Sequence, residues 1–443
     1  MIVASYVFYG WWDWHFIFLL AATTLIAIFG AQVIDRQESP VKRRFAMAIS
    51  VFLALSLLAW FKYYGFFISN IDNTLHKIGA PSGIIPLLSV TLPVGISFFT
   101  FMAVSYLVDV YRQDLPLAKP LDVACYLSFF PHLVAGPIVR GAELLPQLRI
   151  THSPANIDIG RAFWMIFSGL FKKVVIASAV SSAIVDPVFS TPGSHTSLEV
   201  LFAIYGYAVQ IWADFSGYTD MAIGIALLLG IKFPQNFDSP YGAASLQDFW
   251  RRWNMTLSRW LRDYLYIPLG GNKGSKWKTA RNVLITMIVG GLWHGAAWTF
   301  VTWGLIHGLG QAVAHLRMSR RQEKGIAPKA STLRSQIIGR VVTFHIVCLA
   351  WVFFRANSIG DAFTLLKALF TKFGPAPLFS FKIAALIVAA VAIQQLPRGW
   401  AKRVQEAYGK QRLVTQGLLA GCALTLITTL GPPGVAPFIY YRF

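Results

Sequence analysis

The sequence has few charged residues and few cysteines. Asp, Glu, Lys and Arg make up 13% of its 443 residues, which is about half the share found in a soluble globular protein. The three cysteines, Cys125, Cys348 and Cys422, are widely spaced and odd in number, so they form neither a disulfide framework nor a metal-binding knuckle. The chain also lacks a P-loop, a GxSxG elbow, an HExxH motif and paired Cys or His ligands. Nucleotide hydrolysis and a bound metal therefore have no support in the sequence.

Acidic residues are scarcer than basic ones. The chain has 19 Asp and Glu against 39 Lys and Arg, which leaves a net charge of +20. The basic residues gather in short loops between apolar runs, at 35–44, 251–281, 317–340 and 398–412. By the positive-inside rule we expect these loops to face the cytoplasm and its anionic lipid. A nucleic-acid partner is not expected.

Apolar sequence is abundant. Hydrophobic residues make up 56% of the chain, and the mean hydropathy is +0.55. A soluble fold has too little interior for this much apolar surface, so lipid is predicted to be the solvent of most side chains. No polar stretch is long enough to hold a core of its own. The sequence predicts an all-α, multi-pass membrane protein with a single domain over residues 1–443.

About ten apolar runs are long enough to cross the hydrocarbon layer, and residues 2–12 add an eleventh, partial element. The ten runs lie near residues 15–34, 45–61, 92–108, 161–185, 198–213, 217–231, 283–303, 336–354, 380–396 and 413–430. Glycine-interrupted stretches such as 217–231 and 283–316 are open to a second interpretation, as half-spans that re-enter the membrane.

Three segments in the middle of the chain do not have the composition of simple spans. Residues 125–149 carry Pro and Gly inside an apolar run, which suits a re-entrant or interfacial loop. Residues 232–244 are rich in polar turn formers. Residues 245–266 predict one amphipathic helix that starts at a capping box of Ser245 and Asp248. In this helix Trp250 and Asn254 share the apolar sector, and the arginines take the remainder.

His294 is the ionisable residue with the strongest claim to chemistry. Between Arg281 and Arg317 the titratable side chains are all histidines, and an ionisable group at membrane depth is costly to keep. Neutral histidine suits proton transfer near neutral pH. Gly290, Gly291 and Gly295 beside it allow close approach of a helix or a substrate. A buried histidine that is hydrogen-bonded between helices is the alternative.

Two aspartates and one asparagine are further candidates. Asp214 and Asp220 interrupt an apolar run, and a structural ion pair with Arg252 or Arg262 is favoured over a proton relay. From the residues alone, Asn254 is favoured as a structural hydrogen-bonding group.

Four long runs carry the most specific motifs. They are FFPHLVAGPIVRGAELLPQL, WADFSGYTDMAIGIALLLGIKFPQNFDSPY, DFWRRWNMTLSRWLRDYLYIPLGGNKG and GGLWHGAAWTFVTWG, and they lie within residues 90–316. In this order they resemble the membrane-bound O-acyltransferase family, in the bacterial branch that acylates polysaccharides such as alginate.

The resemblance implies a fold, a reaction and two site residues. The fold is a helical bundle with re-entrant and interfacial helices around a central tunnel, and the histidine at its constriction corresponds to His294. The reaction is the transfer of a short acyl group, acetyl by preference, from a cytoplasmic thioester such as acetyl-CoA to an extracytoplasmic polysaccharide or partner-protein hydroxyl. His294 is then the general base, and Asn254 donates a hydrogen bond to the oxyanion.

One position departs from the branch that the sequence resembles. Its WRRWH motif ends in a second histidine, and this sequence has Asn254 there. Three explanations stay open: an Asn/His pair that works, a naturally impaired enzyme, or a deliberately altered sequence.

Further roles and partners follow from the same resemblance. Arg259, Arg262 and Lys273 would attract the phosphates of coenzyme A, although retention of loops by the positive-inside rule explains them equally well. No bound cofactor is expected. The expected partners are the lipid bilayer, an extracytoplasmic lipase-like acyltransferase and the polysaccharide acceptor, at the bacterial cytoplasmic (inner) membrane. The residues expected to support the tunnel are Asp214, Trp250, Arg252, Trp253 and Trp293.

Two competing functions remain. A transporter or flippase would also have broken helices and the intramembrane residues Asp214 and His294. A non-catalytic scaffold of an exopolysaccharide complex is the other. Acyl transfer by the purified protein would separate the acyltransferase hypothesis from both of these alternatives.

Overall fold

The computed structural model describes residues 1–79, 81, 88, 91–327, 332–431, 434 and 438, and these residues form helices and loops without a strand. The predicted all-α class is confirmed. The chain divides into two compact units, Met1–Ile157 with Leu229–Pro234, and Asp158–Leu228 with Gln235–Phe443. The single domain over 1–443 stays a prediction, and each unit is described by itself.

The first unit is organised around α5 (Ile96–Arg112), most of whose residues are buried. It packs against α2 (Phe16–Asp35) and α3 (Pro40–Leu58), and Arg43 at the start of α3 donates a hydrogen bond of 2.9 Å to the carbonyl oxygen of Val110. The other elements of this unit are α1 (Ile2–Gly10), η1 (Ala59–Tyr63), α4 (Tyr64–Lys77), α6 (Pro120–Ser128), α7 (Phe130–Leu133), α8 (Gly141–Leu148) and η2 (Pro154–Asn156). The predicted break of the run 125–149 is therefore present, as three short helices.

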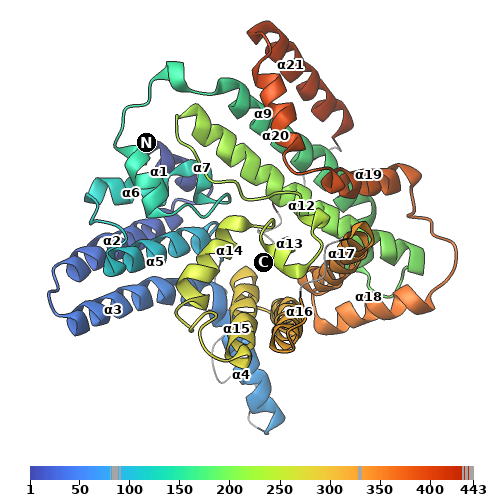
Figure 1. The fold of residues 1–443 in the computed structure, drawn as a ribbon, viewed down its shortest axis with the longest axis horizontal. Helices are drawn as coiled ribbons and strands as arrows, with labels where there is room; N and C mark the ends of the chain where they lie inside the picture. Colours follow the sequence, from blue (N-terminus) through green and yellow to red (C-terminus); the bar gives the residue numbers. More distant parts are fainter. Residues whose placement is uncertain are drawn as a thin grey trace. The chain divides into compact units, whose positions relative to one another are not determined.

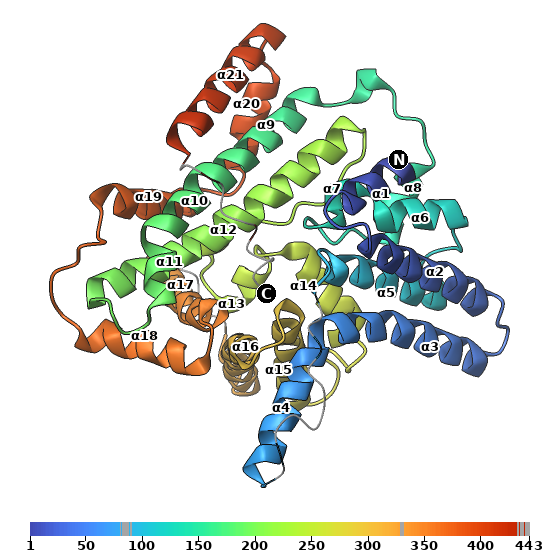
Figure 2. The same ribbon diagram turned by 180° about the vertical axis from the view of Figure 1, so that it is seen from behind.

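In the second unit, α9 (Ile159–Leu170) runs alongside α12 (Ser197–Leu228) (Figures 1 and 2). This unit holds most of the motif-bearing sequence, whereas the run FFPHLVAGPIVRGAELLPQL lies in the first unit. Between them lie η3 (Phe171–Ala177), α10 (Ser178–Val180), η4 (Ser181–Val185) and α11 (Asp186–Ser190). After them come η5 (Pro240–Gly242), α13 (Leu246–Trp250), α14 (Met255–Leu261), η6 (Arg262–Tyr266), α15 (Lys276–His294), α16 (Trp298–Glu323), α17 (Leu333–Arg355), α18 (Ile359–Thr371), α19 (Phe381–Ala392), η7 (Ile393–Gln395), α20 (Trp400–Gly409) and α21 (Leu413–Leu430).

Six helical runs in the described part of the chain are long and apolar enough to cross a membrane, or seven if one bent pair counts as a single span. This confirms a multi-pass membrane protein, with fewer spans than the ten predicted. The two runs 198–213 and 217–231 form one helix, α12, because Asp214 and its neighbours are accommodated inside it. The run 283–303 extends across the break between α15 and α16.

Two ion pairs join the π-helical segment η3 to α12. Lys173 pairs with Asp214, and Lys172 pairs with Asp220. In the first pair the two side chains are only 8% and 4% exposed. Because a buried charge is tolerated only when it is paired, this contact fixes how the two segments meet.

The predicted pairing of the aspartates with Arg252 or Arg262 is therefore wrong. Arg252 pairs with Asp248, and Arg262 pairs with Asp263. Each arginine finds an acid within four residues along the chain, whereas the partners of the α12 aspartates come from a neighbouring helix. Sequence distance gave no indication of that contact.

We expect Lys173→Met to lower the free energy of unfolding by about 3–5 kcal/mol, because it removes the ammonium group that balances the buried carboxylate of Asp214. Unfolding in mixed micelles on titration with a denaturing detergent measures the change. The control is Arg262→Met, which opens a pair whose arginine is 58% exposed and should cost no more than about 1 kcal/mol. Equal losses for the two variants would contradict the expectation.

Candidate functional site

His294 is the last residue of α15, and three residues separate it from the first residue of α16. The two helices lie side by side, and their backbones touch (Figure 1). A Cβ atom on Gly291 would lie 2.2 Å from the carbonyl oxygen of Phe300, and one on Gly304 would lie 2.4 Å from that of Met287. The close approach predicted beside His294 is therefore a contact between helices, and only glycine fits there.

The other end of this helix pair carries the basic loops. Lys276, the first residue of α15, pairs with Glu323, the last residue of α16, at 2.7 Å. The basic residues at the start of α15 and at the end of α16 therefore lie at one end of the pair, as expected if both face the same side of a membrane. A helix of 19 residues is about 28 Å long, so His294 lies nearly a hydrocarbon thickness away from that end.

His294 is 2% exposed and lies among aromatic rings. Its ring centre is 4.9 Å from that of Trp293, 5.0 Å from that of Trp303 and 5.1 Å from that of Phe354, each at a steep angle. The last two come from α16 and α17. Three surrounding rings restrict the orientation of the imidazole, as a proton-transfer group requires.

A continuous set of rings, here called the aromatic cluster, extends from His294. Trp303 stacks on Trp351 at 5.8 Å, and Trp351 lies 5.1 Å from Trp253. The members of the aromatic cluster are Phe249, Trp250, Trp253, His294, Trp303, His307, Trp351 and Phe354. The structure thus brings Trp250 and Trp253, predicted from the sequence, into one cluster with His294.

Asn254 does not lie within a helix. α13 ends at Trp250, α14 starts at Met255, and Asn254 between them has φ +40° and ψ +56°. The prediction of one helix over 245–266, with Asn254 on its apolar side, is therefore wrong. Its predicted start is confirmed, because the Ser245 hydroxyl accepts the backbone N–H of Asp248 at 3.1 Å.

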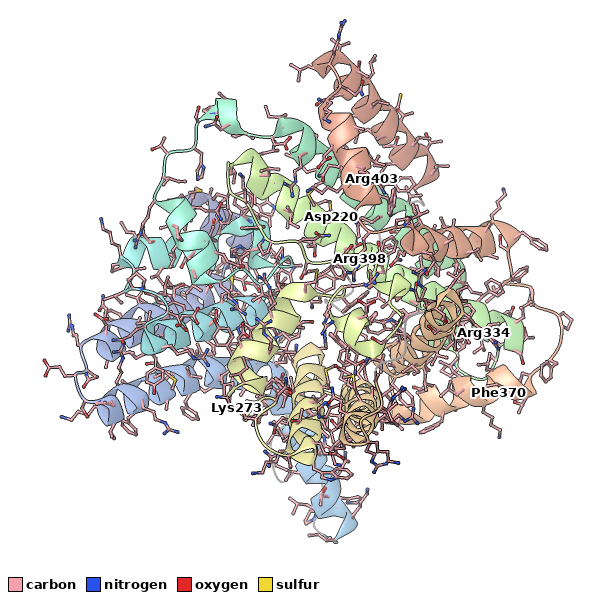
Figure 3. The ribbon with its side chains drawn as sticks, viewed as in Figure 1. Asp220, Lys273, Arg334, Phe370, Arg398 and Arg403 are labelled. Atoms are coloured by element: carbon pink, nitrogen blue, oxygen red, sulfur yellow. The ribbon has the colours of Figure 1, made fainter. Side chains whose placement is uncertain are left out.

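The turn that holds Asn254 is fixed by a charged network. The Asp248 carboxylate accepts hydrogen bonds of 3.0 and 2.7 Å from Arg252 and one of 3.0 Å from Arg398, which Figure 3 labels. Partial burial raises the pKa of Asp248, but the hydrogen bonds and charge of Arg252 outweigh it and lower the pKa below its usual value. The carbonyl oxygen of Arg252 accepts the N–H of Asp238 at 2.9 Å. Arg252 therefore contacts its surroundings in this turn through both its side chain and its carbonyl oxygen.

The side chain of Asn254 is buried and has no hydrogen-bond partner within the described part of the chain. The residue is 1% exposed, and neither its amide nitrogen nor its amide oxygen is bonded. A buried polar group left in this state costs about 1–3 kcal/mol. The left-handed backbone adds strain, and such residues gather at functional sites. The amide of Asn254 is thus available to a ligand.

The remaining predicted residues are distributed over several elements of the second unit. Arg259 is in α14, Arg262 is in η6, and Lys273 is exposed in the loop before α15, where Figure 3 labels it. Arg262 bonds both oxygens of Asp263, at 2.6 and 3.0 Å, so part of its charge is already balanced. Asp214 is paired with Lys173, and Trp293 lies in the last turn of α15. Their roles toward a donor or a tunnel stay predictions.

Sequence reasoning gave His307 only a weak claim and did not single out Trp303, Trp351 or Phe354. Trp303 and His307 are four residues apart on α16, and this spacing on one helix face was the available signal. Trp351 and Phe354 fall in the apolar run 336–354, where a ring that faces the site has the same sequence signature as one that faces lipid.

Comparisons with known proteins show which family the chain resembles over most of its length. The sequence profile of the membrane-bound O-acyltransferase family matches residues 105–356. A protein of Azotobacter vinelandii named probable alginate O-acetylase AlgI is 38% identical over 408 residues, 89% of this chain and 78% of that protein. One of the same name from Pseudomonas putida is 34% identical over all of this chain and 94% of its own length. The peptidoglycan O-acetyltransferase of Helicobacter pylori is 36% identical over 83% of this chain and 73% of its own.

Proposed function

The chain belongs to the membrane-bound O-acyltransferase family and is a membrane-embedded O-acyltransferase, and we propose that it moves an acetyl group from a cytoplasmic thioester, acetyl-CoA, to a hydroxyl on the extracytoplasmic side. The observation that carries this proposal is the position of His294, which is buried at the end of α15 and shares the aromatic cluster with Trp253. The next residue after Trp253 is Asn254, whose buried amide has no hydrogen-bond partner among the described residues. A base and a hydrogen-bond donor in a dry site are the two groups that acyl transfer needs.

The reaction follows from these two groups. A ring nitrogen of His294 takes the proton of the acceptor hydroxyl while its oxygen attacks the thioester carbonyl carbon. The carbonyl oxygen becomes an oxyanion, which accepts a hydrogen bond from the Asn254 amide. When the tetrahedral intermediate collapses, the carbon–sulfur bond breaks. The thiolate that leaves then takes from His294 the proton that came from the acceptor hydroxyl. The products are an ester and a free thiol.

The helix pair α15 and α16 supports the proposed direction of transfer. The basic loops at one end suit the phosphates of the donor, with Arg259, Arg262 and Lys273 as the side chains we assign to them. His294 lies at the far end of α15. An extended donor that reaches from one end to the other would use the tunnel that the family resemblance implies, with its phosphates held in the cytoplasm.

The acceptor we propose is a hydroxyl of a polysaccharide or of a partner protein that carries the acetyl group onward. The names of the relatives support a polysaccharide, because alginate and peptidoglycan share sugar hydroxyls as acceptor groups. We assign the chain to the bacterial cytoplasmic (inner) membrane and expect an extracytoplasmic, lipase-like acyltransferase as its partner.

The sidedness of donor use tests the proposal. Single cysteines at the exposed positions Lys42 and Arg320, in a variant without the three native cysteines, should resist a membrane-impermeant thiol reagent added to intact cells. In vesicles of known orientation, acetyl-CoA should lose its acetyl group only when it is supplied on the side where Arg320→Cys is labelled. Rapid labelling from outside the cell, or equal acetyl-CoA consumption from both sides, would contradict the proposed orientation.

A further inference from the structure

His307 has a defined tautomer in this structure. It is fully buried, and its Nδ1 atom lies 3.3 Å from the indole Nε1 of Trp250. An indole N–H is a donor only, so Nδ1 must be the acceptor. A neutral His307 therefore carries its proton on Nε2. Phe249 stacks parallel to the imidazole at 5.9 Å and an angle of 12°, which fixes the plane of the ring.

The Nε2–H group of His307 has no acceptor among the described residues. Nε2 is buried and unbonded, and so is the indole Nε1 of Trp303. The two residues are one turn apart on α16, with ring centres 4.9 Å apart, and Trp303 lies 5.0 Å from His294 on its other side. Each buried donor without an acceptor costs about 1–3 kcal/mol. Two such donors beside the proposed base indicate that a ligand supplies the missing acceptor.

The position of His307 along α16 indicates which ligand passes it. α16 starts at Trp298, near His294, and ends at Glu323, whose carboxylate meets the basic end of the helix pair. His307 thus lies farther toward the basic end than Trp303 and His294. A donor that enters from that end passes His307 before it reaches His294.

We propose that His307 is a substrate-binding residue whose Nε2–H donates a hydrogen bond to a carbonyl oxygen of the thioester donor. This inference rests on the proposed function. The site offers two N–H donors, and the rings of Phe249, Trp250 and Trp303 around His307 bring no carboxylate. It therefore selects a group that only accepts hydrogen bonds, such as a carbonyl, over a cation. The carbonyl is that of the thioester or that of an amide in the pantetheine arm.

Two variants separate the hydrogen bond from the packing. His307→Phe keeps an aromatic ring and removes the donor, whereas His307→Gln keeps an amide N–H near the place of Nε2. Binding of coenzyme A and of acetyl-CoA is measured by calorimetry, and kcat and KM are measured for acetyl transfer. We expect His307→Phe to weaken acetyl-CoA binding about 10-fold or more and His307→Gln to stay within about threefold of the parent.

The two donor forms identify the carbonyl. If the thioester carbonyl is bound, His307→Phe weakens acetyl-CoA only, and kcat falls by about 100-fold. If an amide carbonyl is bound, both coenzyme A and acetyl-CoA are weakened equally, and kcat is nearly unchanged. Parental affinities and parental kcat in a folded His307→Phe variant would overturn the proposal.

A spectroscopic measurement keeps this inference distinct from the proposed function. In protein with 15N-labelled histidine, assigned by comparison with His307→Gln, His307 should show a protonated Nε2 and an unprotonated Nδ1, and Trp250→Phe should allow both tautomers. A protonated Nδ1 in the parent would overturn the inference even if acetyl transfer is observed. If the tautomer is as expected but neither coenzyme A nor acetyl-CoA binds the parent, the proposed function fails, and the ligand assigned to His307 fails with it.

Discussion

Replacement of His294 by alanine should lower acyl transfer by about 10²- to 10⁴-fold, the loss that accompanies removal of a general base. The side chain is 2% exposed and lies among three aromatic rings, so bulk water has little access to accept the proton in its place. The rate of thiol release from acetyl-CoA in the presence of acceptor, per folded molecule in detergent or vesicles, measures the effect.

The matched control for His294→Ala is His132→Ala. His132 is also a buried histidine, 1% exposed, but it lies in the first unit, where its Nε2 is 3.2 Å from the carbonyl oxygen of Tyr126. The His132→Ala variant should be less stable than the parent but should keep the parental rate of acetyl transfer per folded molecule. A His294→Ala variant that folds and transfers acetyl at the parental rate would exclude His294 as the base.

The second large effect is expected at Asn254, where the backbone decides which substitutions are informative. At φ +40° an alanine adds about 1–2 kcal/mol of left-handed strain to the loss of the amide, so Asn254→Ala mixes two effects. Asn254→Gly removes the side chain without that strain. If the amide stabilises the oxyanion, Asn254→Gly should lower kcat by about 10²-fold or more.

Asn254→His then separates the explanations for the departure from the WRRWH motif. Histidine tolerates the left-handed region better than most residues and also donates a hydrogen bond, but it can carry a proton as well. A modest change in rate identifies an Asn/His pair that works. A large gain in rate identifies a weakened enzyme that needs a second titrating group. Equal rates for the Asn, His and Gly forms would leave residue 254 without a role in transfer.

The sequence predicted those parts of the fold that local pattern controls. The helical class, the membrane-spanning character, the cap at Ser245 and the interruption of 125–149 all depend on composition or on residues a few positions apart. The break at Asn254 was missed, because the helical periodicity of the tryptophans continues across it. The turn there depends on Arg398, which reaches Asp248 from 150 residues farther along the chain.

The candidate site was predicted only in part. His294 and Asn254 stood out by residue type and by the resemblance, and the structure places His294 in the aromatic cluster and Asn254 beside Trp253. The partners of Asp214 and the orientation of His307 were beyond prediction, because both depend on which helices become neighbours. An apolar run in the sequence does not show which of its rings face a site.

The glycine contacts between α15 and α16 also have a mechanical consequence. The carbonyl oxygens of Phe300 and Met287 lie so close to Gly291 and Gly304 that the two helices pack backbone to backbone. We therefore expect the two helices to move as one rigid body, with His294 at the end of α15. Within this unit, we therefore expect the motion that admits a substrate or releases a product in elements outside this helix pair.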